Sequence, residues 1–172
     1  MKILPFIAVL LLNMFLSAET LEEAILKSPA KNGYNHWVEL KKGQIYTGGG
    51  YFTDKKIKII GNAAIVEMQT NDVLYMNGGQ LDIDHTIFIG GQPISITTGS
   101  ASIINNTFYN TSYDCLFFYE AIEGTIIKNN IIMKTGRFGI AVACRVEMPD
   151  PLISYNNIFS TYDWKYAKNC GG

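Results

Sequence analysis

The sequence has little cysteine: a chain of 172 residues contains only three. Cys115, Cys144 and Cys170 are odd in number and have no short paired spacing, so they match neither a zinc site nor a disulfide-rich scaffold. We expect Cys115 and Cys144 to be buried apolar residues. One disulfide that leaves one thiol over is the alternative, and the sequence does not say which cysteines would form it.

An excess of positive charge is also lacking. Lysine and arginine together number 14 against 15 acidic residues, which gives a formal net charge of −1. Proteins that bind nucleic acids usually carry a basic patch or stripe that neutralises phosphates. The composition therefore predicts no nucleic-acid partner.

The longest apolar run is too short for an ordinary membrane span. It extends from Ile3 to Ala18, follows Lys2 and ends before Glu19. A spanning helix needs about 20 apolar residues, whereas a charged start followed by a shorter apolar run is typical of a secretion signal. We expect residues 1–18 to be a cleaved signal peptide and the mature protein to be secreted or periplasmic, with no stable membrane span. An uncleaved anchor is the weaker alternative.

Helical periodicity is lacking after about residue 30. Before that point, Thr20 to Ala30 predict one short helix, with Thr20 as N-cap and Glu22 and Glu23 in the first turn. The rest of the chain reads as strands and turns. We expect residues 19–50 to hold the helix and the first strands.

A sequence pattern recurs along the chain: an apolar strand, a polar corner and a second apolar segment. Its corners are separated by 24, 20, 24 and 27 residues, and they are Asn62, Thr86, Asn106, Asn130 and Asn157. Two positions later comes a column of apolar residues, namely Ala64, Phe88, Phe108, Ile132 and Phe159. A repeat of this length is typical of a solenoid, in which stacked rungs share one core.

The repeat predicts an all-β fold, a right-handed single-stranded parallel β-helix with a short N-terminal capping helix. Residues 51–160 would form its rungs and residues 161–172 a C-terminal tail. Identical amides on successive rungs can hydrogen-bond to one another, so we expect a structural ladder of Asn62, Asn106, Asn130 and Asn157. Ordinary surface turns in an antiparallel sandwich are the alternative.

Residues Thr20 to Ser160 resemble the pectate-lyase-like superfamily of right-handed parallel β-helices, whose repeats are of the PbH1 type and which includes periplasmic copper-site maturation proteins. The resemblance rests on the entry helix from Leu21 to Ile25, the segment from Trp37 to Tyr46 and the paired asparagines. It implies that the helix covers one open end of the coil. No second capping helix follows the rungs, so we expect association through the uncapped C-terminal end, or a truncated chain.

The resemblance also implies a polysaccharide lyase or hydrolase as an alternative function. Lyases of this fold use a lysine or arginine base and a cation, such as Ca²⁺, that offsets the substrate carboxylate. Lys128 and Arg137 are the catalytic candidates, and Asp82 and Asp84 the metal-binding candidates. Asp84 and Lys128 share one column about 10 Å apart, although outward charges on a solenoid usually form only a solvated surface.

Our leading prediction is an exported protein that binds a carbohydrate or another extracellular polymer along its long face. Aromatic rings stack on sugars and arginine grips carboxylates, so the substrate-binding candidates are Asp84, Tyr109, Tyr113, Tyr155, Lys134 and Arg145. A periplasmic maturation or scaffolding protein is the third alternative. The sequence leaves the substrate, catalysis and oligomeric state open.

Overall fold

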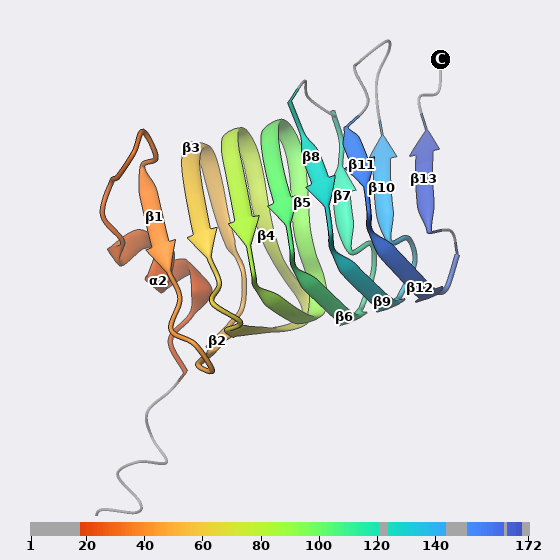
Figure 1. Ribbon diagram of the computed structural model, residues 1–172, viewed down its shortest axis with the longest axis horizontal. Coiled ribbons are helices and arrows are strands. Elements are labelled where there is room, and N and C mark those ends of the chain that lie inside the picture. The colour runs from red at the N-terminus through yellow and green to blue at the C-terminus, as the bar shows by residue number, and fades with distance from the viewer. Residues whose placement is uncertain (1–17, 121–123, 144–150, 164, 170–172) are drawn as a thin grey trace, which may run out of the picture.

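The chain winds into a right-handed parallel β-solenoid of about five turns, preceded by one short helix (Figure 1). The computed structural model describes residues 18–120, 124–143, 151–163 and 165–169. The predicted fold class is thereby confirmed. The predicted signal lies outside the described residues except for Ala18, as do Cys144, Arg145 and Cys170.

The described strands pair only in parallel, each with its equivalent one turn earlier and one turn later. Residues 161–172, expected to be a tail, contribute a strand that pairs with β10. The bounds are β1 His36–Glu39, β2 Ile45–Thr47, β3 Gly50–Ile60, β4 Ile65–Asp84, β5 Ile87–Ile104, β6 Thr107–Thr111, β7 Leu116–Phe118, β8 Ile126–Lys128, β9 Ile131–Thr135, β10 Ile140–Ala143, β11 Leu152–Ser154, β12 Asn157–Thr161 and β13 Tyr166–Asn169.

These pairings form three long sheets around the core. Sheet 1 contains β1, the ends of β3, β4 and β5, and then β8 and β11. Sheet 2 contains β2, the starts of β4 and β5, and then β6, β9 and β12. Sheet 3 contains the start of β3, the middle parts of β4 and β5, and then β7, β10 and β13.

Helix α2, Leu21–Lys27, lies at the N-terminal end of the coil, as predicted (Figure 1). Its first turn is capped by Thr20, whose side-chain oxygen accepts a hydrogen bond from the Glu23 N–H at 3.1 Å. Leu21 and Ile25 are fully buried in the core. No helix in the described part of the chain is long and apolar enough to cross a membrane.

The inward column of sheet 2 differs from the prediction at both ends. Phe88, Phe108 and Ile132 share one register and are fully buried, and the two phenyl rings stack with centroids 5.2 Å apart. Val66 precedes Phe88 in this column and Ile158 follows Ile132. Ala64 and Phe159 were therefore placed incorrectly. The first corner contains residues 61–64, two more residues than the next corner, which contains only 85 and 86.

The buried asparagine ladder contains Asn106, Asn130 and Asn156. The Oδ1 atom of each accepts a hydrogen bond at 2.9 Å from the backbone N–H of the preceding rung, the first from Thr86. Each Nδ2 donates to a strand carbonyl of that same preceding rung, namely Ile83, Ile103 and Ile127. Every buried polar group of this corner thereby gains a partner.

Two residues assigned to the ladder from sequence lie elsewhere. Asn157 is the exposed first residue of β12, one position after Asn156. Asn62 is also exposed, and its Nδ2 donates to the Leu40 carbonyl at 2.9 Å. The last rung was therefore aligned one residue too late, and the longer first corner moves Asn62 out of the column.

Candidate functional site

A hollow of about 180 Å³ opens on the outer surface of sheet 3. It results from side-chain size along one outward column, because Phe117 is followed on the next two rungs by Ala141 and Ala167. A large ring beside two methyl groups leaves a step in the surface. We call this hollow the arginine groove; it is lined by Phe117, Arg137, Phe138, Ala141, Val142, Ala143 and Ala167.

Arg137 is held in a fixed position at this groove. Its Nε donates to Asp114 Oδ1 at 2.8 Å and its Nη2 to Asp114 Oδ2, a two-point ion pair. The Asp114 side chain is only 1% exposed, whereas that of Arg137 is 50% exposed. The Phe138 N–H also donates to Asp114 Oδ1, at 3.2 Å. The hydrogen bond from Asp114 raises the pKa of Arg137, so the groove carries a permanent, pre-oriented cation.

Two further rings continue the outward column of Phe117 toward the N-terminal end. Tyr51, Tyr75, Ser95 and Phe117 occupy successive rungs. The tyrosine rings lie 5.6 Å apart, and the Tyr75 hydroxyl shares a hydrogen bond of 2.7 Å with Thr97. Tyr51 is 69% exposed. We call Tyr51, Tyr75 and Phe117 the aromatic strip; it leads along the coil into the arginine groove.

The two catalytic candidates lie in different sheets. Lys128 ends β8 in sheet 1, where its Nζ lies 5.6 Å from the centre of the Tyr155 ring. Arg137 comes before β10 in sheet 3 and is paired with Asp114. Asp84 and Lys128 do share a column, with Ile104 between them. The geometry therefore brings Lys128 to Tyr155 rather than to Arg137.

Protein donors already occupy both metal-binding candidates. Asp82 accepts hydrogen bonds from the Tyr34 hydroxyl and from Gln80 Nε2, the latter at 3.2 Å. Asp84 Oδ1 lies 2.7 Å from His85 Nδ1 and accepts from Asn105 Nδ2 at 3.0 Å. Within residues 18–120, 124–143, 151–163 and 165–169, no three His, Cys, Asp or Glu side chains gather as a metal site would require.

Of the remaining sugar-binding candidates, Tyr109, Lys134 and Tyr155 lie away from the arginine groove. Lys134 Nζ donates to the Tyr109 hydroxyl at 2.9 Å, on the outer side of sheet 2. Tyr155 lies at the corner between β11 and β12. Tyr113 is half exposed and comes directly before Asp114, and its carbonyl accepts a hydrogen bond from the Arg137 N–H at 3.3 Å, so it lies at the corner of the groove. Arg145 lies outside the described residues.

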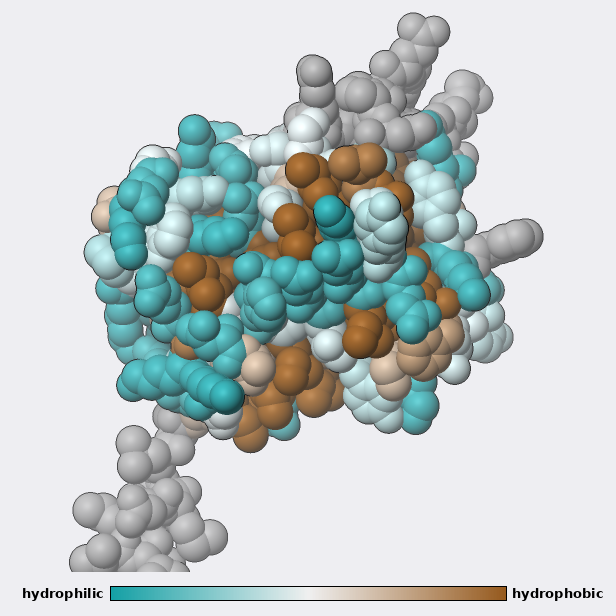
Figure 2. Space-filling view, in the orientation of Figure 1, coloured by the Kyte–Doolittle hydropathy of each residue, from teal (hydrophilic) through white to brown (hydrophobic). Residues whose placement is uncertain are grey.

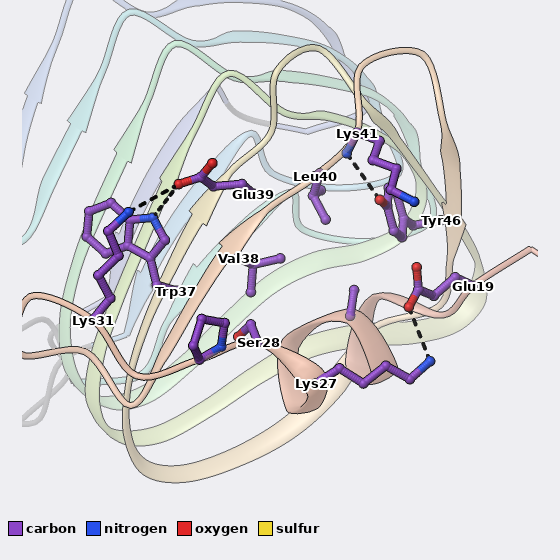
Figure 3. Close-up of a pocket in the computed structure, with 12 residues that line it drawn as sticks. Glu19, Lys27, Ser28, Lys31, Trp37, Val38, Glu39, Leu40, Lys41 and Tyr46 are labelled. Atoms are coloured by element: carbon purple, nitrogen blue, oxygen red, sulfur yellow. Dashed lines mark hydrogen bonds and ion pairs between the residues drawn. The ribbon is translucent and has the colours of Figure 1, made fainter.

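A second hollow, of about 440 Å³, lies between α2 and β1 at the N-terminal mouth of the coil (Figure 3). Val38 and Leu40 lie within it, and ion pairs flank it. Lys27 contacts Glu19 at 3.2 Å, and Lys31 contacts Glu39 at 3.5 Å. The hydrogen bond from Trp37 and the charge of Lys31 lower the pKa of Glu39. These charges already neutralise one another in pairs, so the mouth offers a ligand less than the arginine groove does.

The raised pKa of Tyr34 should lower the free energy of unfolding at alkaline pH. Burial and the hydrogen bond to Asp82 raise its pKa from 10.0 to about 12. The unfolded chain therefore releases this proton at lower pH than the folded chain, and the free energy of unfolding should fall between pH 10 and about 12. Tyr34→Phe should reduce this fall in urea titrations, whereas exposed Tyr162→Phe should not. An unchanged pH dependence in Tyr34→Phe would contradict this role.

Sequence reasoning selected Arg137 but missed Asp114, Phe117 and Phe138. A usable signal was present: Thr111 and Thr135 pair in register, so Tyr113 and Arg137 follow at equivalent places and Asp114 comes one position later. Each threonine hydroxyl donates to the carbonyl two residues on, at 3.1 Å. A threonine column therefore marks the corner that carries the ion pair.

The sequence and the fold of this chain were compared with those of known proteins. No family model matches the chain, and searches of curated proteins and of solved structures found no similar protein. What is established is the class of fold, a right-handed parallel β-solenoid with a short N-terminal helix.

Proposed function

We propose that this protein binds a carbohydrate polymer along the aromatic strip and the arginine groove of sheet 3. The observation that carries the proposal is the guanidinium of Arg137, fixed by the buried Asp114 beside the rings of Phe117 and Phe138. Sugars present apolar faces that stack on aromatic rings and hydroxyl edges that accept hydrogen bonds. The groove offers both kinds of contact without reordering its charged group.

The length of the strip favours a polymer over a single sugar. Tyr51 and Phe117 are three rungs apart in register, which corresponds to about 14 Å along the coil axis. A ligand that contacts both rings must therefore contain several sugar units. A resemblance to the pectate-lyase-like superfamily supports the same ligand class, and we propose that binding takes place after export and removal of residues 1–18.

We propose binding rather than cleavage. Lys128 and Arg137 lie in different sheets, and the carboxylates of Asp82 and Asp84 are occupied by protein donors. Among the described residues, no three His, Cys, Asp or Glu side chains gather to form a cation site next to the aromatic strip. A polysaccharide incubated with the protein should accordingly bind without forming unsaturated products, which would be visible by ultraviolet absorbance.

Removal of one ring tests the proposal. In affinity electrophoresis against a panel of acidic and neutral polysaccharides, Phe117→Ala should weaken binding about tenfold, which corresponds to about 1.4 kcal/mol. Arg137→Ala should weaken it to a similar extent, because the fixed cation is lost. The control is Tyr155→Ala, since Tyr155 is an exposed ring at a different corner of the coil.

Two outcomes would count against this site. If Tyr155→Ala weakens binding as strongly as Phe117→Ala does, the ligand lies on another face. If no polysaccharide in the panel retards the wild-type protein, carbohydrate binding itself is refuted. Far-ultraviolet circular dichroism of each variant ensures that a loss of binding does not reflect a loss of fold.

A further inference from the structure

The outer surface of sheet 2 is apolar across several rungs. Its strands expose two outward columns that run along the coil. We call the isoleucines of the first column and the apolar residues of the second the sheet 2 face; it comprises Ile45, Ile65, Ile87, Ile131, Ile89, Tyr109, Met133 and Phe159. The first column also contains the polar residues Thr107, between Ile87 and Ile131, and Asn157, at its end. Figure 2 shows hydrophobic residues at the surface along the lower edge of the molecule, where these strands lie in Figure 1.

A sheet with one face in water normally alternates apolar and polar residues. Here the inward column is already buried, since Phe88 and Ile132 have no exposed surface. The segments 87–89 and 131–133 are nevertheless apolar at all three positions. Uninterrupted apolar strands are typical of parallel sheets that are covered on both faces. The sheet 2 face therefore has the composition of a surface that another layer covers.

The charges at its edges indicate what that layer is. Glu67 continues the second column at β4, and Lys134 follows Met133 near the end of β9; both are exposed, and Lys134 Nζ also donates to the Tyr109 hydroxyl of its own chain. A two-fold axis in the interface, parallel to the strands and between β5 and β6, reverses the strand order. It places β4 of one copy opposite β9 of the other. Glu67 then lies beside the partner's Lys134, and the reciprocal pair forms by symmetry.

We propose that a second copy of this chain docks on the sheet 2 face, with the two coils antiparallel. Two sheets packed face to face lie about 10 Å apart, which lets the isoleucines of both copies interdigitate. The face measures about 30 Å by about 10 Å, or about 300 Å². Since stable complexes bury about 800 Å² per partner, the dimer should be weak and rapidly reversible, and it should form only at high protein concentration.

Sedimentation velocity over a concentration series tests the dimer. The wild-type protein should shift from monomer toward dimer as its concentration rises. Ile131→Lys should keep it monomeric throughout, because Ile131 is 42% exposed on the face and would meet β4 of the second copy. The matched control is Leu152→Lys, which places the same charge on sheet 1 at an apolar residue that is 60% exposed; it should dimerise like the wild type.

A charge reversal tests the arrangement of the two copies. Glu67→Lys alone and Lys134→Glu alone should each weaken the dimer several-fold, because each brings like charges together. The double variant should restore the wild-type dissociation constant to within about twofold. A wild-type protein that stays monomeric at every concentration would overturn the proposal. A double variant that does not recover the wild-type affinity would also overturn it. So would a dimer that Tyr162→Lys abolishes and Ile131→Lys does not, because Tyr162 lies on the last rung, after the end of β12, and is not part of the sheet 2 face.

Discussion

Asn130→Ala should lower the free energy of unfolding by about 3 kcal/mol, because it leaves several buried groups without partners. The Asn130 side chain accepts hydrogen bonds from the backbone and the side-chain amide of Asn106, and it donates to the Ile103 carbonyl and to Asn156 Oδ1. Alanine can replace none of these bonds, and water has little access since Asn130 is only 1% exposed. Urea denaturation followed by circular dichroism measures the change.

The control for this variant is Asn157→Ala. Asn157 is exposed and lies one residue beyond the ladder, so its replacement should change the free energy of unfolding by no more than about 0.5 kcal/mol. The register of the last rung would be disproved if Asn157→Ala proved as destabilising as Asn130→Ala.

Phe108→Ala should have the largest effect on stability, a loss of about 3–5 kcal/mol. Phe108 is fully buried and stacks on Phe88 with ring planes 9° apart. Removing the ring leaves a cavity that the flanking rungs cannot fill, because strand pairing above and below fixes their spacing. Thermal and urea unfolding of the variant measure the loss.

The control for this variant is Phe159→Ala, measured at low protein concentration, where the proposed dimer does not form. Phe159 is 38% exposed on the outer side of β12, whereas Ile158 faces the core. Its truncation should cost less than about 1 kcal/mol. Equal losses in the two variants would mean that Phe159, and not Ile158, continues the inward column.

The rungs were predictable because the repeat period and the apolar columns are written directly in the sequence. The errors of this prediction lie where the local sequence pattern fits two alignments equally well. Asn156 and Asn157 are chemically identical neighbours, and only the pairing of Leu152 with Ile126 and of Ile158 with Ile132 identifies Asn156 as the ladder residue. Asn62 was assigned to the ladder because it follows an apolar strand as the other corner asparagines do. The two additional residues of this corner, within 61–64, give no local sign of the shift.

The candidate site was predictable only in part, because it depends on contacts between rungs. In the structure Leu74, Ile94, Leu116 and Ile140 form one inward apolar column of sheet 3. Because side chains alternate along a strand, the next residue in each faces outward, which gives Tyr75, Ser95, Phe117 and Ala141. The aromatic strip could thus have been found. For the ion pair the threonine column marks only the corner, and the contact between Asp114 and Arg137 becomes visible only when adjacent rungs are paired in register.

The most direct test of ligand binding on sheet 3 is a nuclear magnetic resonance titration of the isotope-labelled protein. The ligand is an oligosaccharide prepared from the polysaccharide that retards the protein in affinity electrophoresis. The predicted result is that the largest amide shifts follow Tyr75, Phe117 and Phe138, with small changes around Trp37 and Ile131. Shifts concentrated at Trp37 in the N-terminal mouth, or at Ile131 on sheet 2, with sheet 3 unchanged, would contradict the account.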